Sequence, residues 1–226
     1  MLKRFTILLG SLALFACDAF ADKTNTSKFV AGTHYEVVSE TATAKPEVRE
    51  FFSFYCGHCY RFEPIVQQLE KSLPAGVELQ KNHVDFIQAA TPEVQNAMAR
   101  GYLVGKAAGK GDEIASLIFH HIHETRGQFT APEDIRSLML INNFDAQAFD
   151  SKFNSLPVLS AAQQMKDQQT LWSSKASPAD PKMPVLAGVP MLLVNGKYQV
   201  KLAALDAKNI DKELAELVTY LLQKQD

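Results

Sequence analysis

The hydrophobic pattern of the chain changes character twice. Strand patterns occur toward both ends: an almost continuous apolar run at residues 48–54, an alternating stretch at 77–86, and two short apolar runs around Asn195-Gly196. Asn-Gly between apolar runs is a strong hairpin signal. Between residues 91 and 172 the apolar positions recur at helical spacing, in five segments with no strand between them. The pattern therefore predicts an α/β fold with an inserted all-helical subdomain.

Individual residues mark the ends of several elements. We expect a helix over Tyr60–Leu73 with a kink at Pro64, because proline lacks the backbone N–H that a helix interior needs. Thr130 and Glu133 fit a capping box that opens the third inserted helix, with Pro132 in its first turn. The other expected elements are a strand at 35–38, helices opening at Asp145 and Pro157, a long loop at 173–186 and a terminal helix at about 209–223.

The first 21 residues have the pattern of a secretory signal peptide. Lys3 and Arg4 precede an apolar stretch, and the small residues Ala19 and Ala21 suit a cleavage site, so we expect export and cleavage after Ala21. The apolar stretch is shorter than the ~20 residues that a spanning helix needs. The alternative is a lipoprotein leader cleaved before Cys17, which would then carry a lipid.

Composition and charge narrow the possible functions. The 226 residues are 46% hydrophobic and 21% charged, as in ordinary globular proteins. The net charge is −2, and removal of Lys3, Arg4 and Asp18 with the leader leaves −3, without a basic patch for nucleic acid. Of three cysteines, only Cys56 and Cys59 remain after cleavage, so the exported chain is not a disulfide-stapled scaffold.

The two remaining cysteines stand where the strand at 48–54 passes into a helix. The positive end of a helix dipole and its unpaired N–H groups favour the thiolate, the reactive form of cysteine. A zinc site would need a second pair of ligands, haem attachment would need histidine in place of Tyr60, and a structural disulfide closing so short a loop would restrain the unfolded chain little. We therefore expect thiol–disulfide exchange at Cys56 and Cys59, with no metal and no cofactor. His58 between them is either an exposed loop residue or, as we expect, a group that stabilises the thiolate.

The sequence around this pair resembles the DsbA family of bacterial periplasmic thiol oxidases, within the thioredoxin superfamily. The similarity covers nearly all of the mature chain. It implies a thioredoxin-like fold, a central mixed sheet flanked by helices, built from residues 22–88 and 173–226, with residues 89–172 as the helical insertion. The matching motifs are Glu50–Cys56, Lys81-x-His83-Val84-x-Phe86, Gly188-Val189-Pro190 and Val194–Tyr198.

The resemblance also implies roles for the matched residues. Cys56 would be the exposed nucleophile, and Cys59 the buried resolving cysteine. Val189-Pro190 would be a cis peptide facing the disulfide, where the backbone of a substrate could pair with the loop. The residues alone favour trans, because cis is the minority form even before proline.

Three further positions concern the strength of the oxidant. The resemblance makes Glu50 and Lys81 a buried charged pair beneath the cysteines, whereas the sequence alone allows two strand-end charges in solvent. Gly57 departs from the family, in which Pro-His usually separates the cysteines. Gly-His is typical of protein disulfide isomerases, which are weaker oxidants. The loop at 173–186 is also longer than is usual before the cis-proline.

The implied function is a monomeric periplasmic protein disulfide oxidase that donates the Cys56–Cys59 disulfide to reduced secreted proteins. The resemblance implies reoxidation by a quinone-linked inner-membrane protein of the DsbB type. The alternatives are an isomerase or reductase with the same pair, or a chaperone that binds peptides by strand addition. Residues 22–33 are too few for the dimerisation domain of an isomerase, and a chaperone would not need both thiols.

A cluster of histidines in the second inserted helix raises a metal hypothesis. On a helix His120 and His123 share one face, whereas His121 points elsewhere, so we expect a solvated helix face instead. Trp172, at the end of the helical region, is expected to pack near the junction of the subdomains.

Overall fold

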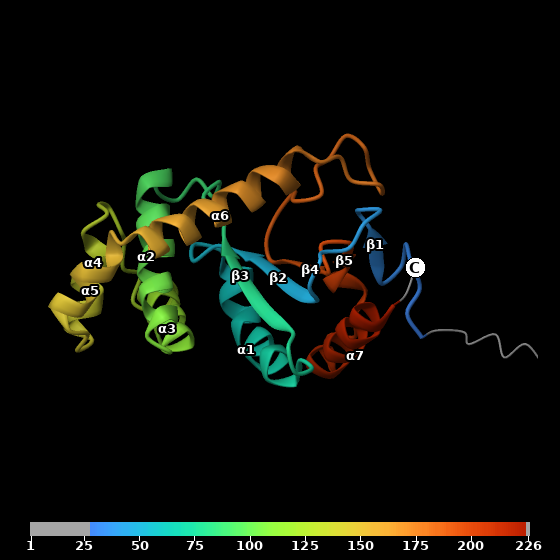
Figure 1. The fold of residues 1–226 in the computed structure, drawn as a ribbon, viewed down its shortest axis with the longest axis horizontal. Helices are drawn as coiled ribbons and strands as arrows, with labels where there is room; N and C mark the ends of the chain where they lie inside the picture. Colours follow the sequence, from blue (N-terminus) through green and yellow to red (C-terminus); the bar gives the residue numbers. More distant parts are fainter. Residues whose placement is uncertain (1–27, 225–226) are drawn as a thin grey trace, which may run out of the picture.

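The structure, a computed structural model, describes residues 28–224 (Figure 1). The expected leader, its cleavage after Ala21 and the alternative at Cys17 lie outside these residues. The sheet has the order β1-β5-β4-β2-β3, with β2 and β3 parallel and the other neighbours antiparallel, so the expected mixed sheet is confirmed. The strands are β1 (Tyr35–Val37), β2 (Glu47–Phe52), β3 (Glu78–His83), β4 (Met191–Val194) and β5 (Tyr198–Val200). Within residues 28–224 no helix is long and apolar enough to cross a membrane.

Helices cover both faces of the sheet (Figure 1). On one face, α1 (Gly57–Ser72) and α7 (Ile210–Gln223) pack their apolar sides against alternate residues of β2 and β4. On the other face lies the end of α6 (Leu156–Ser174), where Trp172 joins an apolar cluster with Phe51 and Leu193. Because successive side chains of a strand point to opposite faces of the sheet, the strands contribute to one core on each face.

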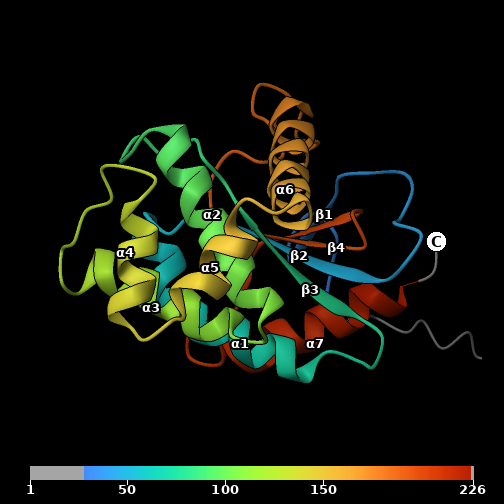
Figure 2. The ribbon, with the colours of Figure 1, turned by 60° about the vertical axis from the view of Figure 1, so that its left-hand side comes forward.

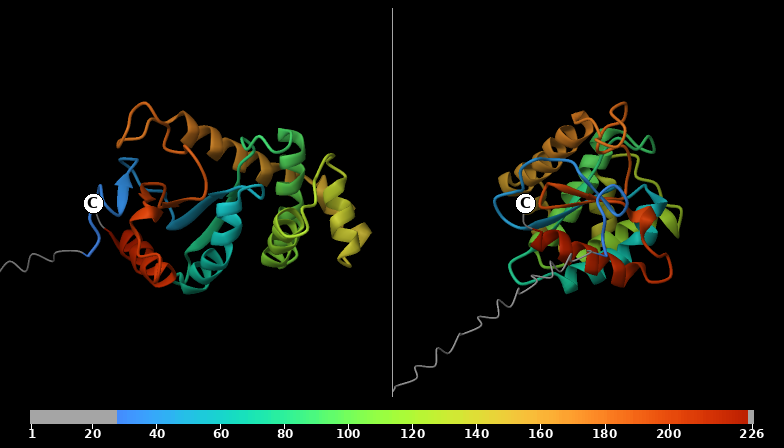
Figure 3. Two further views of the ribbon diagram at one scale, coloured as in Figure 1. Left: turned by 180° about the vertical axis from the view of Figure 1, so that it is seen from behind. Right: turned by 90° about the vertical axis from the view of Figure 1, so that its right-hand side faces the viewer.

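The chain between β3 and β4 forms five helices, as the sequence predicts. They gather beside the sheet, and α6 runs from this group back over the sheet (Figures 2 and 3). Asp145 caps the fourth helix by accepting the N–H of Ala148 at 2.7 Å, as expected. The expected limit of the insertion at Trp172 falls inside α6, and the division at 88/89 and 172/173 stays a prediction. Besides α6, the inserted helices are α2 (Pro92–Ala107), α3 (Gly111–His123), α4 (Asp134–Ile141) and α5 (Ala146–Phe153).

The passage from β2 to α1 differs from the expectation. β2 ends at Phe52, two residues early, and α1 begins at Gly57 rather than Tyr60. The reason is a turn in which the N–H of Cys56 donates to the carbonyl of Ser53 at 3.0 Å. Cys56 then becomes the N-cap of α1, because its sulfur accepts the N–H of Cys59. Pro64 lies within α1 and does not end it.

The expected capping box is wrong. α4 begins only at Asp134, so Glu133 is not its third residue and Pro132 precedes the helix. The carboxylate of Asp134 instead accepts the N–H groups of Thr130 at 2.7 Å and Ala131 at 2.9 Å. Asp134, the first residue of the helix, therefore closes the preceding turn. It binds the backbone N–H group that Glu133 would have bound in a capping box.

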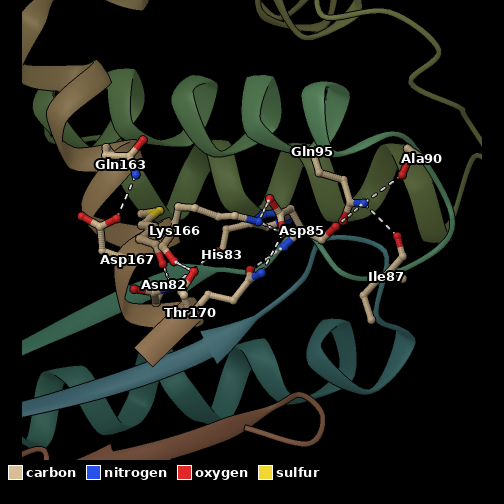
Figure 4. Close-up of polar contacts among 12 residues, drawn as sticks. Asn82, His83, Asp85, Ile87, Ala90, Gln95, Gln163, Lys166, Asp167 and Thr170 are labelled. Carbon is tan, nitrogen blue, oxygen red and sulfur yellow. Dashed lines mark hydrogen bonds and ion pairs between the residues drawn. The ribbon is translucent and has the colours of Figure 1, made fainter. Parts of the chain in front are cut away.

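β3 ends at His83, three residues before the predicted limit. The N–H of Val84 still donates to the carbonyl of Phe52 in β2, but from Asp85 onward the segment is bonded to side chains (Figure 4). On one side the carboxylate of Asp85 binds Lys166 of α6 at 2.6 and 2.7 Å. On the other side the fully buried amide of Gln95 from α2 donates to three carbonyls at 2.8–3.1 Å. These are the carbonyls of Asp85, Ile87 and Ala90.

α2 and α3 approach one another closely at Gly105. A Cβ there would lie 2.2 Å from Cγ1 of Ile114 and 2.9 Å from its Cβ. We expect Gly105→Ala to lower the free energy of unfolding by about 1–3 kcal/mol, measured by urea denaturation, because neither helix can yield without disturbing the core. Gly111→Ala is the matched control, since its Cβ would meet atoms at 3.5 Å and alanine favours the helix. An equal loss in both variants would contradict the close-packing explanation.

Candidate active site

The two cysteines occupy different environments at the start of α1. Cys59 is fully buried and Cys56 is half-buried. The N–H of Cys59 donates to Sγ of Cys56 at 3.3 Å, and the thiol of Cys56 donates to the carbonyl of Val189 at 3.4 Å. Burial, together with the hydrogen bond to Cys56, raises the pKa of the Cys59 thiol well above its ordinary value. Cys56 is therefore the sulfur that a second thiol can reach, and Cys59 is the shielded one.

The loop before β4 faces this pair. The Val189–Pro190 peptide is cis, as the family resemblance implies. The carbonyl of Val189 points to Cys56, and Met191, the next residue after Pro190, begins the strand paired with β2. The sheet thus holds the cis-proline loop and the cysteines opposite one another.

Two cavities are lined by residues close to Cys56 in the chain. A cavity of about 870 Å³ is lined by His58 and Phe62 of α1, by Val189 and Pro190, and by residues just before α7. His58 itself is exposed. A second cavity of about 550 Å³ lies on the side of the helical insertion, between Tyr55 and the loops at 89–91 and 126–130. The first cavity thus belongs to α1, the cis-proline loop and the segment before α7, whereas the second lies mostly on the insertion.

A buried charge cluster lies beneath the cysteines. Glu50 and Lys81 are register partners in β2 and β3, and both are buried. Nζ of Lys81 is 3.4 Å from Oε2 of Glu50 and donates a hydrogen bond to Glu63 of α1. Glu63 is a member of this cluster that was not predicted from the sequence. Its spacing of four residues from Cys59, on the same helix face, is the signal that could have found it.

One ammonium group therefore faces two carboxylates. Burial is the largest influence on Glu50 and raises its pKa to about 7; the charge of Lys81 opposes this and the charge of Glu63 adds to it. Burial alone would lower the pKa of Lys81, but the two carboxylates raise it above its ordinary value. Lys81 therefore stays protonated, and Glu50 is the residue whose carboxylate takes up a proton near pH 7.

This cluster makes stability depend on pH. The pKa of Glu50 is about 7 in the folded protein against an ordinary value of 4.5, so the stability from its bound proton is present at low pH and is lost as pH rises through about 7. We expect Glu50→Gln to gain more than about 1 kcal/mol relative to the parent between pH 5 and pH 8, because the amide does not titrate. Urea unfolding of the disulfide form of both proteins at each pH measures this.

The buried His83 changes the pH dependence of stability in the opposite direction to Glu50. Burial lowers its pKa to about 3, so its contribution is lost as pH falls from about 6.5. Because both proteins contain His83, its effect cancels in the difference. The same pH profile in the parent and in Glu50→Gln would contradict the assignment to Glu50.

The expectation of a solvated histidine face holds only for His120, which is exposed. His121 and His123 are half-buried. The ring of His123 stacks on Tyr60 with centroids 4.9 Å apart, and its Nε2 lies 2.8 Å from the carbonyl oxygen of Phe54. The prediction failed because α3 packs against the start of α1, a contact that the spacing of the histidines does not encode. Among residues 28–224 no group of three or more acidic, histidine or cysteine side chains is placed to hold a metal ion.

A thioredoxin-like sheet that presents one accessible and one shielded cysteine beside a cis-proline loop defines the class of thiol:disulfide oxidoreductases. Comparison with known proteins is more specific. A family model described as the DSBA-like thioredoxin domain matches residues 47–217. The chain therefore belongs to the DsbA family.

The relatives span the full length of the chain. The thiol:disulfide interchange protein DsbA of Pectobacterium carotovorum subsp. carotovorum is 34% identical, and that of Escherichia coli K12 is 29% identical; in both cases the match covers 100% of each chain. Among solved structures, the disulfide oxidoreductase DsbA from Proteus mirabilis is 29% identical with a TM-score of 0.72, covering 87% of this chain and 98% of that one. A structure of Proteus DsbA with a non-covalently bound peptide is 28% identical with the same TM-score of 0.72, covering 88% and 100%.

Proposed function

We propose that this protein is a periplasmic disulfide oxidase that transfers the Cys56–Cys59 disulfide to reduced secreted proteins. The observation that carries the proposal is the asymmetry of the two sulfurs. Cys56 is accessible and caps a helix, whereas Cys59 is fully buried behind it. An incoming thiolate can therefore attack only the sulfur of Cys56. The sulfur of Cys59 is the leaving group, and it can re-form the disulfide when the protein is reoxidised.

The exchange proceeds in two steps. A substrate thiolate attacks Sγ of Cys56, the bond to Cys59 breaks, and Cys59 leaves with the electron pair and takes up a proton. A second substrate thiolate then attacks the substrate sulfur of this mixed disulfide, and Cys56 is released. The substrate gains one disulfide, and two electrons and two protons pass to the protein.

The residues around the pair are proposed to assist in distinct ways. Val189 and Pro190 would receive the backbone of the substrate opposite Cys56, and the cavity lined by His58 would receive its side chains. A solved structure of Proteus DsbA holds a non-covalently bound peptide, which supports the binding of peptides by this chain. His58 and Gly57, at the helix start, and the charged residues Glu50 and Lys81 beneath it are proposed to set the strength of the oxidant.

The electrons that the protein collects must leave it. We propose a quinone-linked inner-membrane protein of the DsbB type as the acceptor, and the periplasm as the location, reached after cleavage at Ala21. A monomer is proposed as the working form, because neither step of the exchange needs a second copy of the chain.

Two measurements test the function. The disulfide form should oxidise a reduced, unfolded test protein in a one-to-one ratio. Equilibration with glutathione should give a reduction potential well above the about −270 mV of thioredoxin. A potential near that of thioredoxin would contradict the oxidase and favour a reductase. Reshuffling of scrambled disulfides at a rate above that of oxidation would favour an isomerase.

A further inference from the structure

Two histidines hold opposite sides of Phe54, two positions before Cys56. The N–H of Phe54 donates to Nε2 of His83 at 3.2 Å, and the carbonyl oxygen of Phe54 lies 2.8 Å from Nε2 of His123. A backbone N–H only donates and a carbonyl only accepts. Nε2 of His83 is therefore unprotonated, and Nε2 of His123 carries a hydrogen that it donates. The first ring belongs to β3, and the second comes from the helical insertion.

His123 also lies against the first turn of α1. Its ring plane is within 8° of the plane of Tyr60, and its Cε1 is 4.0 Å from the point where a Cβ on Gly57 would stand. The next residue, Glu124, accepts a hydrogen bond of 2.6 Å from the hydroxyl of Tyr60. His123 and Glu124, at the end of α3, thus both bind Tyr60 in the first turn of α1.

We propose that His123 is a positioning residue for the exchange reaction at Cys56. Its N–H binds the carbonyl of Phe54, a fully buried residue, and so fixes the short turn that ends at Cys56. That turn sets where the Cys56 sulfur lies relative to the N–H of Cys59 at 3.3 Å and the carbonyl of Val189 at 3.4 Å. This role deepens the proposed function and rests on it.

Loss of the His123 donor has a defined consequence. The carbonyl of Phe54 either stays buried without a partner or draws the turn toward water. An unpartnered buried carbonyl is costly, so we expect the turn to move, which takes the Cys56 sulfur away from the N–H of Cys59. A hydrogen bond to a cysteine sulfur is stronger when that sulfur is a thiolate than when it is part of a disulfide, so the N–H of Cys59 stabilises the reduced protein more than the oxidised one. A protein without the donor is therefore a weaker and slower oxidant.

Three variants of the full-length mature protein separate the hydrogen bond from the packing of the ring. His123→Phe keeps a ring against Tyr60 but has no donor, whereas His123→Gln keeps an amide N–H that can reach the carbonyl. His120→Phe is the matched control, because it adds the same ring at an exposed position of the same helix. Each variant is equilibrated with glutathione buffers, and its rate of oxidation of a reduced cysteine peptide is measured.

We expect His123→Phe to shift the glutathione equilibrium about tenfold toward the disulfide form and to slow peptide oxidation to a similar extent. We expect His123→Gln to stay within about threefold of the parent and His120→Phe to match it. A parental value for His123→Phe would overturn the proposal. Equal shifts in His123→Phe and His123→Gln would also overturn it, because they would assign the effect to packing.

If His123→Phe does not fold, His123→Gln decides: a parental equilibrium supports the proposal and a tenfold shift overturns it. A failure of the proposed function is distinguishable, since it would appear in the parent as an absence of oxidation. The role of His123 is measured only by the differences in glutathione equilibrium between the parent and the variants.

Discussion

Replacing Cys56 with serine is expected to abolish oxidation of a reduced test protein, to the rate of the uncatalysed reaction. The hydroxyl of serine forms no disulfide, and Cys59 cannot take over because it is fully buried and burial raises the pKa of its thiol. The rate of disulfide formation in the test protein, followed by free-thiol titration, measures the loss. Oxidation by Cys56→Ser at the parental rate would contradict the role of Cys56 as the sulfur that the substrate attacks.

Cys59→Ala is the companion variant. Its Cys56 still attacks oxidised substrates, but no second thiol is present to release the mixed disulfide. We expect covalent complexes to accumulate that disappear on reduction, visible by electrophoresis without reductant. Such complexes should be absent from Cys56→Ser, so the pair of variants distinguishes the attacked sulfur from the leaving one.

Lys81→Met is expected to have the largest effect on stability among the buried charges. It removes the ammonium group between Glu50 and Glu63 and leaves two acids in the core without a counter-charge. We expect a loss of about 3–5 kcal/mol in the free energy of unfolding at pH 8, and a smaller loss at pH 5, where protonation neutralises Glu50.

A lysine outside the core provides the control for this change. Lys166 pairs with Asp85 at 2.6 Å, but its side chain is 45% exposed. Lys166→Met should therefore cost less than about 1 kcal/mol. A similar small loss in both variants would show that the cluster beneath the cysteines contributes no more than a surface ion pair.

The sequence predicted the parts of this structure that are encoded locally. The hairpin at Asn195-Gly196 formed where expected, since both residues have the positive φ, 53° and 58°, that this turn requires. The capping box at Thr130 failed because a neighbouring acid, Asp134, satisfied the same backbone donors. A motif of four residues does not show which of two nearby acids will close the turn.

The parts of the site that were missed depend on distant contacts. Glu63 was recoverable from helix spacing, but the contact of His123 with Phe54 joins residues 69 positions apart. It exists only because α3 packs against the start of α1. Nothing in the spacing of three histidines on one helix indicates which of them meets another part of the chain.

The inserted helices take part in both recognition and chemistry at the cysteines. The sulfur atoms are held by β2, α1 and the cis-proline loop, and His123 of the insertion binds the backbone just before them. The cavity on the insertion side is lined by Tyr55 and by the loops at 89–91 and 126–130 with their neighbours. Those loops belong to the insertion, and the first of them is bonded to α2 because Gln95 donates to the carbonyl of Ala90 at 2.9 Å. Sequence change in those loops can therefore alter which polypeptides are received without touching the contact of His123 with Phe54. In evolutionary terms, substrate specificity can change in the loops while the strength of the oxidant is tuned separately, at the end of α3.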